Sequence, residues 1–403
     1  MEMTERMKES PVSNAVKTGD GHIEFLDQLR GMAIFWVFTY HCVVVAFWPL
    51  LGSGELKWDG WMRDWSVPAS FLAVFPLTLG WIGVPMFFVV SGFCIHLSHV
   101  KSRKPGWKVF FIRRFFRIYP PYLAALLFFG LLFPWTRLHF SADILHTHAE
   151  WFYSTMQMGV HVFLLHNFSE ISVTGINPAF WSIAVEVQLY LLYPLVFWML
   201  RFISPRRVLW IVGFIEVGLR MLESLYLIFH PGAEVPIWFA KEPLIYWFSW
   251  LMGAVLAEAF MAGRALPFQR LVWIAPALLL GCYFIKPLFP LCFTLAALST
   301  ASLMALLLMK GGKINLLGFE GLSRHFHFSG TVSYSAYLIH MPLLYMVPTL
   351  LERLSPGYQV GGMVVLISCL LAWLPILGLS WLVYRAIELP SIAWGKNIIA
   401  RLT

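Results

Sequence analysis

The sequence predicts an all-α polytopic membrane protein, and three observations lead to that prediction. Of its 403 residues, 59% are apolar and only 12% are charged, whereas about 25% of a typical soluble domain is charged. Its mean hydropathy is +0.72. Its apolar runs are continuous over about 20 residues, while the strands of a membrane β-barrel alternate and are about half as long. The composition excludes a disordered chain, a coiled coil and a disulfide-stabilised secreted domain.

Ten apolar segments are each close to the length that a helix needs to cross a bilayer. Pro85 falls in the long second segment and predicts a kink or a re-entrant start there. Pro287 and Pro290 form a corner between the seventh and eighth segments, which we expect to be a tight helical hairpin. The expected spans, good to a few residues, are 29–51, 71–98, 118–134, 180–200, 208–229, 243–262, 271–289, 291–309, 331–351 and 361–386.

The distribution of positive residues predicts the orientation of these spans. With the N-terminus in the cytoplasm, 21 of the 29 Lys and Arg residues fall on the cytoplasmic side and six outside, as the positive-inside rule requires. This explains the net charge of +8 without a nucleic-acid partner. We expect a polar cytoplasmic tail over 1–22, a membrane domain over 23–392 and a short cytoplasmic tail over 393–403. We expect a multi-pass protein of the cell membrane, that is, of the inner or plasma membrane; the oligomeric state stays open.

Charged residues inside a span are costly, so those that occur are candidates for function. The first segment opens with Asp27 and Arg30 and carries His41 deep within it. Arg30 and His41 are 11 residues apart, so they share one helix face and lie about 16 Å apart along its axis. Asp27 can pair with Arg30 at the i,i+3 spacing. The alternative is an interfacial arginine and a hydrogen-bonded structural histidine.

A second cluster lies where the third span begins. It contains Arg113, Arg114 and Arg117, followed by Tyr119 and Tyr122. A phosphorylated, adenine-bearing ligand would suit this cluster, because guanidinium groups bind phosphate in a bidentate manner and tyrosine rings can stack on a base. The alternative is the group of positive residues that anchors many membrane helices at the cytoplasmic interface.

A third pattern forms a polar stripe on the fourth span, which enters from outside and contains Trp181 in its first turn. Ser182, Glu186 and Tyr190 recur at i,i+4. A carboxylate at this depth must be paired, protonated or exposed to a wet cavity. Pairing with Arg220 of the fifth span is one alternative to a direct catalytic role. Arg220 could instead be neutralised by two glutamates of its own helix.

Two further groups of polar residues lie near the C-terminal end of the chain. Tyr334, Tyr337 and His340 share one helix face at i,i+3 spacing in the ninth span. Arg385 and Glu388 at the end of the tenth span are best interpreted as a local ion pair.

The sequence predicts no metal site. Its five cysteines sit in or beside apolar spans without metal-binding or redox spacing, and they are interpreted as small core residues. The histidine pairs His96 with His99 and His146 with His148 lack carboxylates that would converge with them. Glycine motifs that bind phosphate, including the P-loop, are absent.

Six stretches match, in order, those of the integral-membrane acyltransferase family 3, which the chain resembles from about residue 22 to 392. They are FLDQLRGMAI with the Arg-x10-His motif that ends at His41, GWIGVPMFFVVSGFCI, RRFFRIYPPY, NPAFWSIAVEVQLYLLYPL, SYSAYLIHMP and YRAIELP. Members of this family O-acylate exported carbohydrates and some small molecules. Many bacterial members carry a C-terminal hydrolase-like domain; we expect this chain to be a stand-alone membrane domain.

The resemblance implies transfer of an acyl group, most commonly acetyl, from an acyl-CoA donor to an acceptor hydroxyl on a cell-surface or exported carbohydrate. His41 is expected to act as general base, because imidazole accepts a proton near neutral pH. Glu186 would orient the acceptor or tune a histidine, with Asp27 assisting. The expected donor-binding residues are Arg30, Arg113, Arg114, Arg117, Tyr119 and Tyr122, and the expected acceptor-binding residues are Trp181, Ser182, Tyr190, Tyr334, Tyr337 and His340. No permanently bound cofactor is expected.

A transporter or exporter without acyl-transfer chemistry is the competing interpretation, since polar residues at mid-depth also line transport pathways. The absence of paired broken helices and inverted repeats in the sequence argues against it. Direct transfer and relay through an acyl-histidine both agree with the sequence, as do several acceptors and acyl chain lengths.

Overall fold

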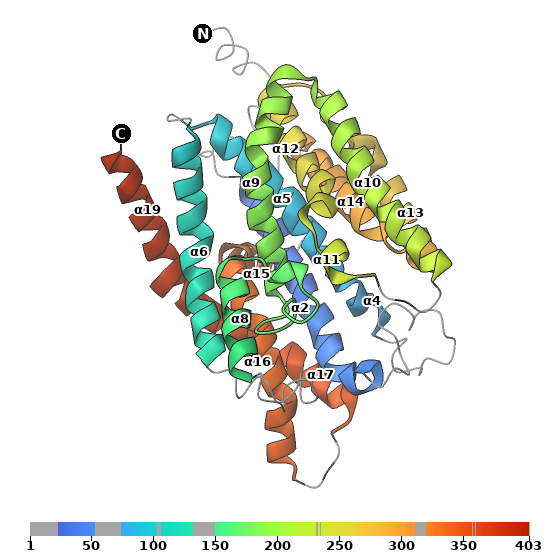
Figure 1. Cartoon of the computed structure of the whole chain (residues 1–403), viewed down its shortest axis with the longest axis vertical. Coiled ribbons are helices and arrows are strands. Elements are labelled where there is room, and N and C mark those ends of the chain that lie inside the picture. The colour runs from blue at the N-terminus through green and yellow to red at the C-terminus, as the bar shows by residue number, and fades with distance from the viewer. Residues whose placement is uncertain are drawn as a thin grey trace.

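The computed structural model describes residues 23–52, 74–102, 106–131, 150–230, 233, 235–310, 320–356, 358 and 360–402, which form helices and no strand (Figure 1). The α-helices are α2 (Glu24–Gly52), α4 (Phe75–Thr78), α5 (Gly83–Val100), α6 (Trp107–Leu131), α8 (Glu150–Val162), α9 (Phe180–Phe202), α10 (Pro205–Phe229), α11 (Ile237–Ala240), α12 (Trp247–Met261), α13 (Ile274–Tyr283), α14 (Leu291–Met309), α15 (Glu320–Thr331), α16 (Ser333–Leu354), α17 (Gly362–Leu371), α18 (Trp373–Val383) and α19 (Leu389–Arg401). Short 3-10 turns are η2 (Leu79–Ile82), η4 (His166–Phe168), η5 (Pro243–Tyr246), η6 (Gln269–Leu271) and η7 (Lys286–Leu288), and a π-helical turn covers Tyr384–Glu388. The all-α prediction is confirmed for this part of the chain.

Six helical stretches in the described residues are long and apolar enough to cross a membrane. Most of the other expected spans fall on helices that are short, such as α13, or that carry several charges, such as α6 and α10. The count of ten and the cytoplasmic position of both termini therefore stay predictions. The six stretches are Phe25–Phe47, Phe75–Val100, Phe180–Phe202, Pro243–Met261, Leu291–Met309 and Gly362–Arg401.

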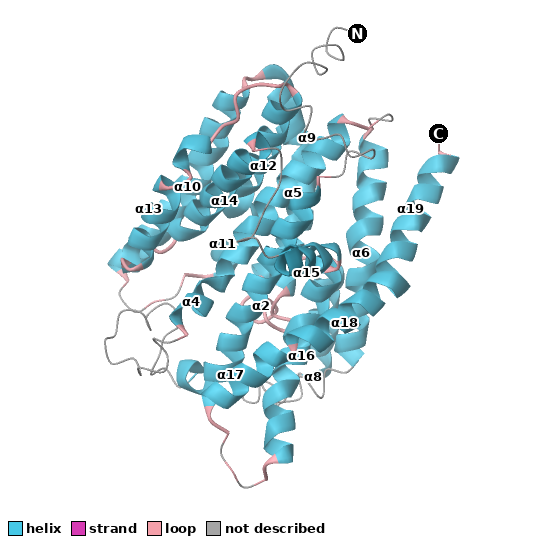
Figure 2. Cartoon of the chain, turned by 180° about the vertical axis from the view of Figure 1, so that it is seen from behind, coloured by secondary structure: helices cyan, strands magenta, loops and turns pink. Residues whose placement is uncertain are grey.

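The second expected span is interrupted, and the last one is longer than expected. The second consists of α4, the 3-10 turn η2 and α5, which begins two residues before Pro85, so the expected break is present. The last stretch, Gly362–Arg401, is helical over 40 residues. It continues beyond residue 392, where we expected a tail to begin, because α19 packs along α6 (Figure 2). Gly395 permits this contact: a Cβ there would lie 2.7 Å from Cβ of Phe116. The tail over 1–22 lies outside the described residues.

Helix α2 occupies the centre of the bundle. It contacts α5, α15, α16 and α17, while α10, α13 and α14 stand together on one side and α6 with α19 on the other (Figure 1). Helices α13 and α14 pack against each other, which confirms the expected hairpin. The position of α2 brings its polar residues into contact with several neighbouring helices.

Glycines allow the closest helix contacts. In the crossing of α5 with α12, a Cβ on Gly92 would lie 2.0 Å from the carbonyl oxygen of Trp250, and one on Gly253 would lie 1.9 Å from that of Val89. The crossing of α2 with α15 is equally close, at Gly31 and Gly330. Small residues let helix backbones approach where the bilayer provides no hydrophobic driving force.

The buried charges of α10 neutralise one another locally. Nη1 of Arg220 lies 3.1 Å from Oε2 of Glu223, and Glu216 accepts hydrogen bonds from Ser249 and Thr294. Arg220 thus pairs within its own helix, which was one of the two alternatives that the sequence left open. Glu186 has other partners.

We expect Gly92→Ala and Gly253→Ala each to destabilise the fold, because the added methyl group collides with backbone atoms that cannot rotate away. Overpacking costs about 1–3 kcal/mol, and the measurement is the midpoint of thermal unfolding in detergent. Gly218→Ala in α10 is the matched control, since a Cβ there meets no atom within 4 Å. Equal midpoints for all three variants would contradict the close crossing.

Candidate active site

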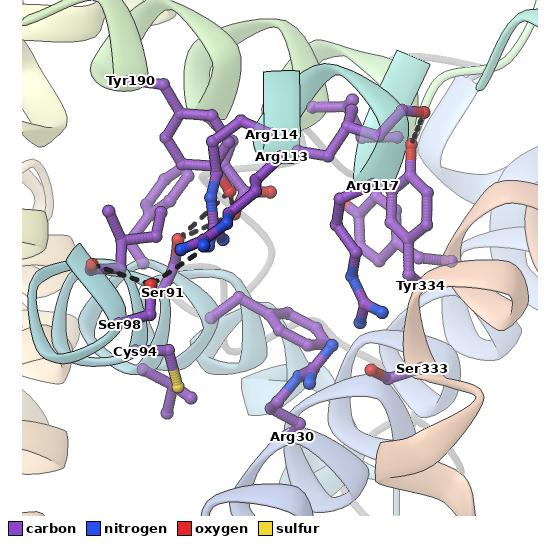
Figure 3. A pocket seen from close by; sticks show the side chains of 18 of the residues that line it. Arg30, Ser91, Cys94, Ser98, Arg113, Arg114, Arg117, Tyr190, Ser333 and Tyr334 are labelled. Carbon is purple, nitrogen blue, oxygen red and sulfur yellow. Dashed lines mark hydrogen bonds between the residues drawn. The ribbon is translucent and has the colours of Figure 1, made fainter. Parts of the chain in front are cut away.

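A cavity of about 490 Å³ opens among helices α2, α5, α6, α9, α16 and α19 (Figure 3). Its polar lining residues come from segments far apart in the sequence, and the central position of α2 and the packing of α19 on α6 bring them together. These residues are Arg30, Ser91, Ser98, Arg113, Arg114, Arg117, Ser182, Glu186, Tyr190, Ser333, Tyr334, Tyr337 and Lys396.

The cavity has a surplus of positive charge. Four arginines and Lys396 line it, against the single carboxylate of Glu186. The side chains of Arg30 and Arg117 point from α2 and α6 into the same space (Figure 3). Arg30 also lies 3.6 Å from Asp27, measured from Nη1 to Oδ1, which confirms the i,i+3 pair expected from the sequence. The lining therefore favours a ligand with several negative charges.

Glu186 is held by two hydroxyl groups in the wall of this cavity. Ser91 Oγ donates to its Oε1 at 2.8 Å, and Tyr190 Oη donates to the same oxygen at 2.5 Å. The polar stripe of α9 that the sequence predicted thus faces the cavity. The hydrogen-bond partners of Glu186 are Ser91 and Tyr190 rather than Arg220 or a histidine. No direct contact therefore supports the suggestion that Glu186 tunes a histidine.

Arg117 is the one cavity arginine with a buried carboxylate partner. Its Nη1 lies 3.0 Å from Oε1 of Glu388, and Ser335 donates to the other carboxylate oxygen at 2.7 Å. The expected local pair of Glu388 with Arg385 is wrong, because the π-helical turn Tyr384–Glu388 directs Glu388 into the protein while Arg385 stays exposed beside Trp381.

Helix α16 links the cavity to a pair of histidines. Tyr337 lines the cavity, shares a hydrogen bond of 2.6 Å with Ser182, and has its ring centroid 5.4 Å from that of His340. Nε2 of His340 lies 3.0 Å from Nδ1 of His41. His41 itself is half-buried and does not line the cavity. The two residues singled out on α2, Arg30 and His41, thus belong to neighbouring regions joined by Tyr337.

Besides His340, three residues of the expected binding set lie outside the cavity. Tyr119 and Tyr122 donate to the backbone carbonyls of Val162 and His161, which fixes α6 to α8. Trp181 lies beneath the ammonium group of Lys241, 3.9 Å from the ring centroid. None of the three lines the cavity. Tyr334 does line it, with its hydroxyl donating to the carbonyl of Ile118 at 2.8 Å.

Sequence reasoning missed Ser91, Lys396 and the buried role of Glu388. Ser91 is a single hydroxyl in an apolar span, and Lys396 belongs to a segment expected to be a tail. For Glu388 alone the sequence contained an indication of its role, because its partner Arg117 is one of a few arginines that lie close to a predicted span.

Comparison with protein families matches residues 23–385 to the family described as "Acyltransferase domain". The chain belongs to this acyltransferase family. No solved structure matches it significantly.

Curated relatives of the acyltransferase agree with the family. Acyltransferase MdmB of Streptomyces mycarofaciens is 26% identical over 285 residues, which cover 66% of this chain and 69% of that protein. Peptidoglycan O-acetyltransferase OatA of Listeria monocytogenes is 27% identical over 314 residues, covering 69% of this chain and 47% of that protein. O-acetyltransferase OatA of Staphylococcus aureus is 27% identical over 196 residues, 45% of this chain and 30% of that protein. The match thus spans about half or less of the length of these two O-acetyltransferases.

Two buried histidines of this acyltransferase stack on each other where α8 meets the turn η4. The rings of His161 and His166 stack with centroids 4.1 Å apart and an interplanar angle of 2°, and Nδ1 of His161 donates to the carbonyl of Gln157. Burial lowers the pKa of His161 to about 4 and that of His166 to about 3, the latter with a contribution from His161. Both rings are therefore neutral in the folded protein near neutral pH.

We expect the stability of the protein to fall as the pH drops below about 6.5, the pKa of an unperturbed histidine. Below that pH the two histidines are protonated in the unfolded chain but stay neutral in the folded one. The free energy of unfolding therefore falls by about 1.4 kcal/mol per pH unit for each histidine. In the variant His166→Phe, the loss of thermal stability between pH 6.5 and 4.5 should be smaller than in the wild type, as measured by thermal unfolding. The control His230→Phe, at an exposed histidine, follows the wild type. Identical pH curves for wild type and His166→Phe would contradict this account.

Proposed function

We propose that the chain transfers an acyl group, most commonly acetyl, from acyl-CoA to a hydroxyl group of a carbohydrate. Membership of the acyltransferase family supports the reaction type. The names of two relatives, a peptidoglycan O-acetyltransferase and an O-acetyltransferase, favour acetyl as the group and a cell-envelope polysaccharide such as peptidoglycan as the acceptor. The proposed location is the cell membrane.

The surplus of positive charge in the cavity is the observation that supports acyl-CoA as the donor. Coenzyme A bears a pyrophosphate and a ribose phosphate, and the cavity offers four arginines and a lysine, of which only Arg30 and Arg117 form ion pairs with carboxylates, those of Asp27 and Glu388. Arg113 and Arg114 are held by hydroxyl groups of Ser102 and Ser98 rather than by carboxylates, so their charges remain available to phosphate. Charge-assisted hydrogen bonds from guanidinium groups are the strong contacts that such a ligand uses.

His41 is the proposed general base. It accepts the proton of the acceptor hydroxyl while the oxygen attacks the thioester carbonyl, and the C–S bond breaks as the tetrahedral intermediate collapses. The departing thiolate takes a proton back from the imidazolium, so that free CoA and the ester are released. The Tyr337 end of the cavity is where the thioester would come closest to the His41–His340 pair.

The hydroxyl-rich wall beside Arg114 is the proposed place of the acceptor hydroxyl (Figure 3). Glu186, Tyr190 and Ser91 form one hydrogen-bonded group, and Ser182 with Tyr337 forms another one turn along α9. Carboxylate and hydroxyl groups of this kind orient sugar hydroxyls through hydrogen bonds. In this arrangement Glu186 orients the acceptor.

We expect purified protein supplied with acetyl-CoA to release free CoA when soluble peptidoglycan glycan strands are added, and to acetylate them. General-base catalysis contributes about 10²–10⁴-fold, so His41→Ala should lower the rate by at least about 100-fold. His230→Ala is the matched control, because that histidine is exposed at the end of α10. Free CoA is measured with a thiol reagent and acetyl groups by mass spectrometry.

Two results would contradict the proposal. A His41→Ala variant that folds normally and keeps the full rate would exclude the general base. Wild-type protein that moves glycan across proteoliposome membranes without consuming thioester would instead favour the transporter.

A further inference from the structure

We propose that His340 is a positioning residue that fixes the tautomer of His41, leaving Nε2 of His41 as the basic atom. The catalytic consequence rests on the proposed function, whereas the tautomer is a property of the resting protein. Three steps lead from the hydrogen bonds of His340 to this assignment.

The first step concerns Nδ1 of His340. It lies 3.1 Å from the carbonyl oxygen of Ala336 and 2.9 Å from that of Tyr337. A carbonyl oxygen only accepts hydrogen bonds, so Nδ1 of His340 must carry a proton. The ring is thereby tied to the backbone of its own helix.

The second step concerns the charge of His340. Its side chain is 0% exposed, and among the described residues no carboxylate forms an ion pair with it. An unpaired cation buried at membrane depth is costly, so the ring is neutral. With its only proton on Nδ1, its Nε2 carries a lone pair.

The third step transfers this constraint to His41. Nδ1 of His41 lies 3.0 Å from the lone pair of His340 Nε2, and two lone pairs at that distance would repel each other. Nδ1 of His41 therefore donates. A neutral His41 then has its lone pair on Nε2, which makes no hydrogen bond within the described part of the chain and belongs to a half-buried side chain.

The position of His340 is itself fixed by Pro342. A proline inside a helix leaves the carbonyl four residues earlier without its usual donor, here that of Leu338. Nδ2 of Asn177 donates to this carbonyl at 2.9 Å. The loop before α9 thus anchors α16 two residues from His340 and keeps its ring in register with His41.

The arrangement follows the logic of catalytic triads, in which a third group holds the histidine base in its correct tautomer. A carboxylate usually fills that place, and loss of the correct tautomer costs about 10⁴-fold in rate there. A neutral histidine does the same work without bringing a negative charge into the bilayer.

The experiment is ¹⁵N NMR of the imidazole groups in the full-length protein labelled with ¹⁵N-histidine, with His41 assigned from the spectrum of His41→Gln. We expect a protonated Nδ1 and a bare Nε2 on His41 in the wild type. His325 is an internal reference for that tautomer, because its Nε2 accepts from Nε1 of Trp373 at 3.0 Å. A wild-type His41 with the proton on Nε2 would overturn the proposal without any variant.

Two variants test the role of His340. His340→Ala removes the hydrogen-bond acceptor and should give a mixture of His41 tautomers. Its kcat should be at least tenfold lower, while its KM for acetyl-CoA should stay within about twofold of wild type, because the general base is impaired and donor binding is not. His340→Gln retains an acceptor oxygen and should restore the tautomer and most of kcat. An unchanged kcat and tautomer in His340→Ala would overturn the assignment.

The two proposals fail separately. A wild-type protein with a protonated Nδ1 on His41 but no acyl transfer would overturn the proposed function and leave the tautomer assignment standing. Acyl transfer that depends on His41, combined with a proton on its Nε2, would overturn the role of His340 alone.

Discussion

The bilayer offers no water to a polar group, so every charge within the bundle needs a partner in the protein. Arg220 finds Glu223, and Arg117 finds Glu388. Arg30 lies beside Asp27, but Arg113, Arg114 and Lys396 line the cavity with Glu186 as its single carboxylate, and none of the three forms an ion pair within the described residues. This unbalanced charge separates the cavity from the structural ion pairs, and the assignment of an anionic acyl donor depends on it.

Helix α16 connects two kinds of chemistry. Tyr334 and Tyr337 face the charged cavity, and one turn further His340 meets His41 on α2. In the proposed mechanism, binding of the phosphorylated donor and removal of the hydroxyl proton would take place in adjoining regions along this one helix. Such a division would suit the proposed acyl-CoA donor, because the phosphates could stay among the arginines while only the acyl group reaches the histidine pair.

Much of this organisation could be predicted from the sequence, because charges are rare in it. Their scarcity made Arg30, His41 and Glu186 stand out, and helical periodicity was enough to pair Asp27 with Arg30. Contacts between distant segments could not be found this way. The pairing of Arg117 with Glu388 depends on a π-helical turn, and the cavity wall at Lys396 depends on the packing of α19 against α6. Tyr119 and Tyr122 were expected to bind the donor beside the arginines, yet their hydroxyls donate to backbone carbonyls of α8.

The central claim is that the charged cavity binds the donor while His41 acts only in transfer. The direct measurement is the affinity of purified protein for coenzyme A by isothermal titration calorimetry. Hydrogen bonds to charged groups contribute about 1.5–3 kcal/mol, so Arg30→Gln and Arg114→Gln should each weaken binding by about tenfold or more. His41→Ala and the control Arg207→Gln, outside the cavity, should bind as the wild type does. Unchanged affinity in the Arg30 and Arg114 variants would contradict the account.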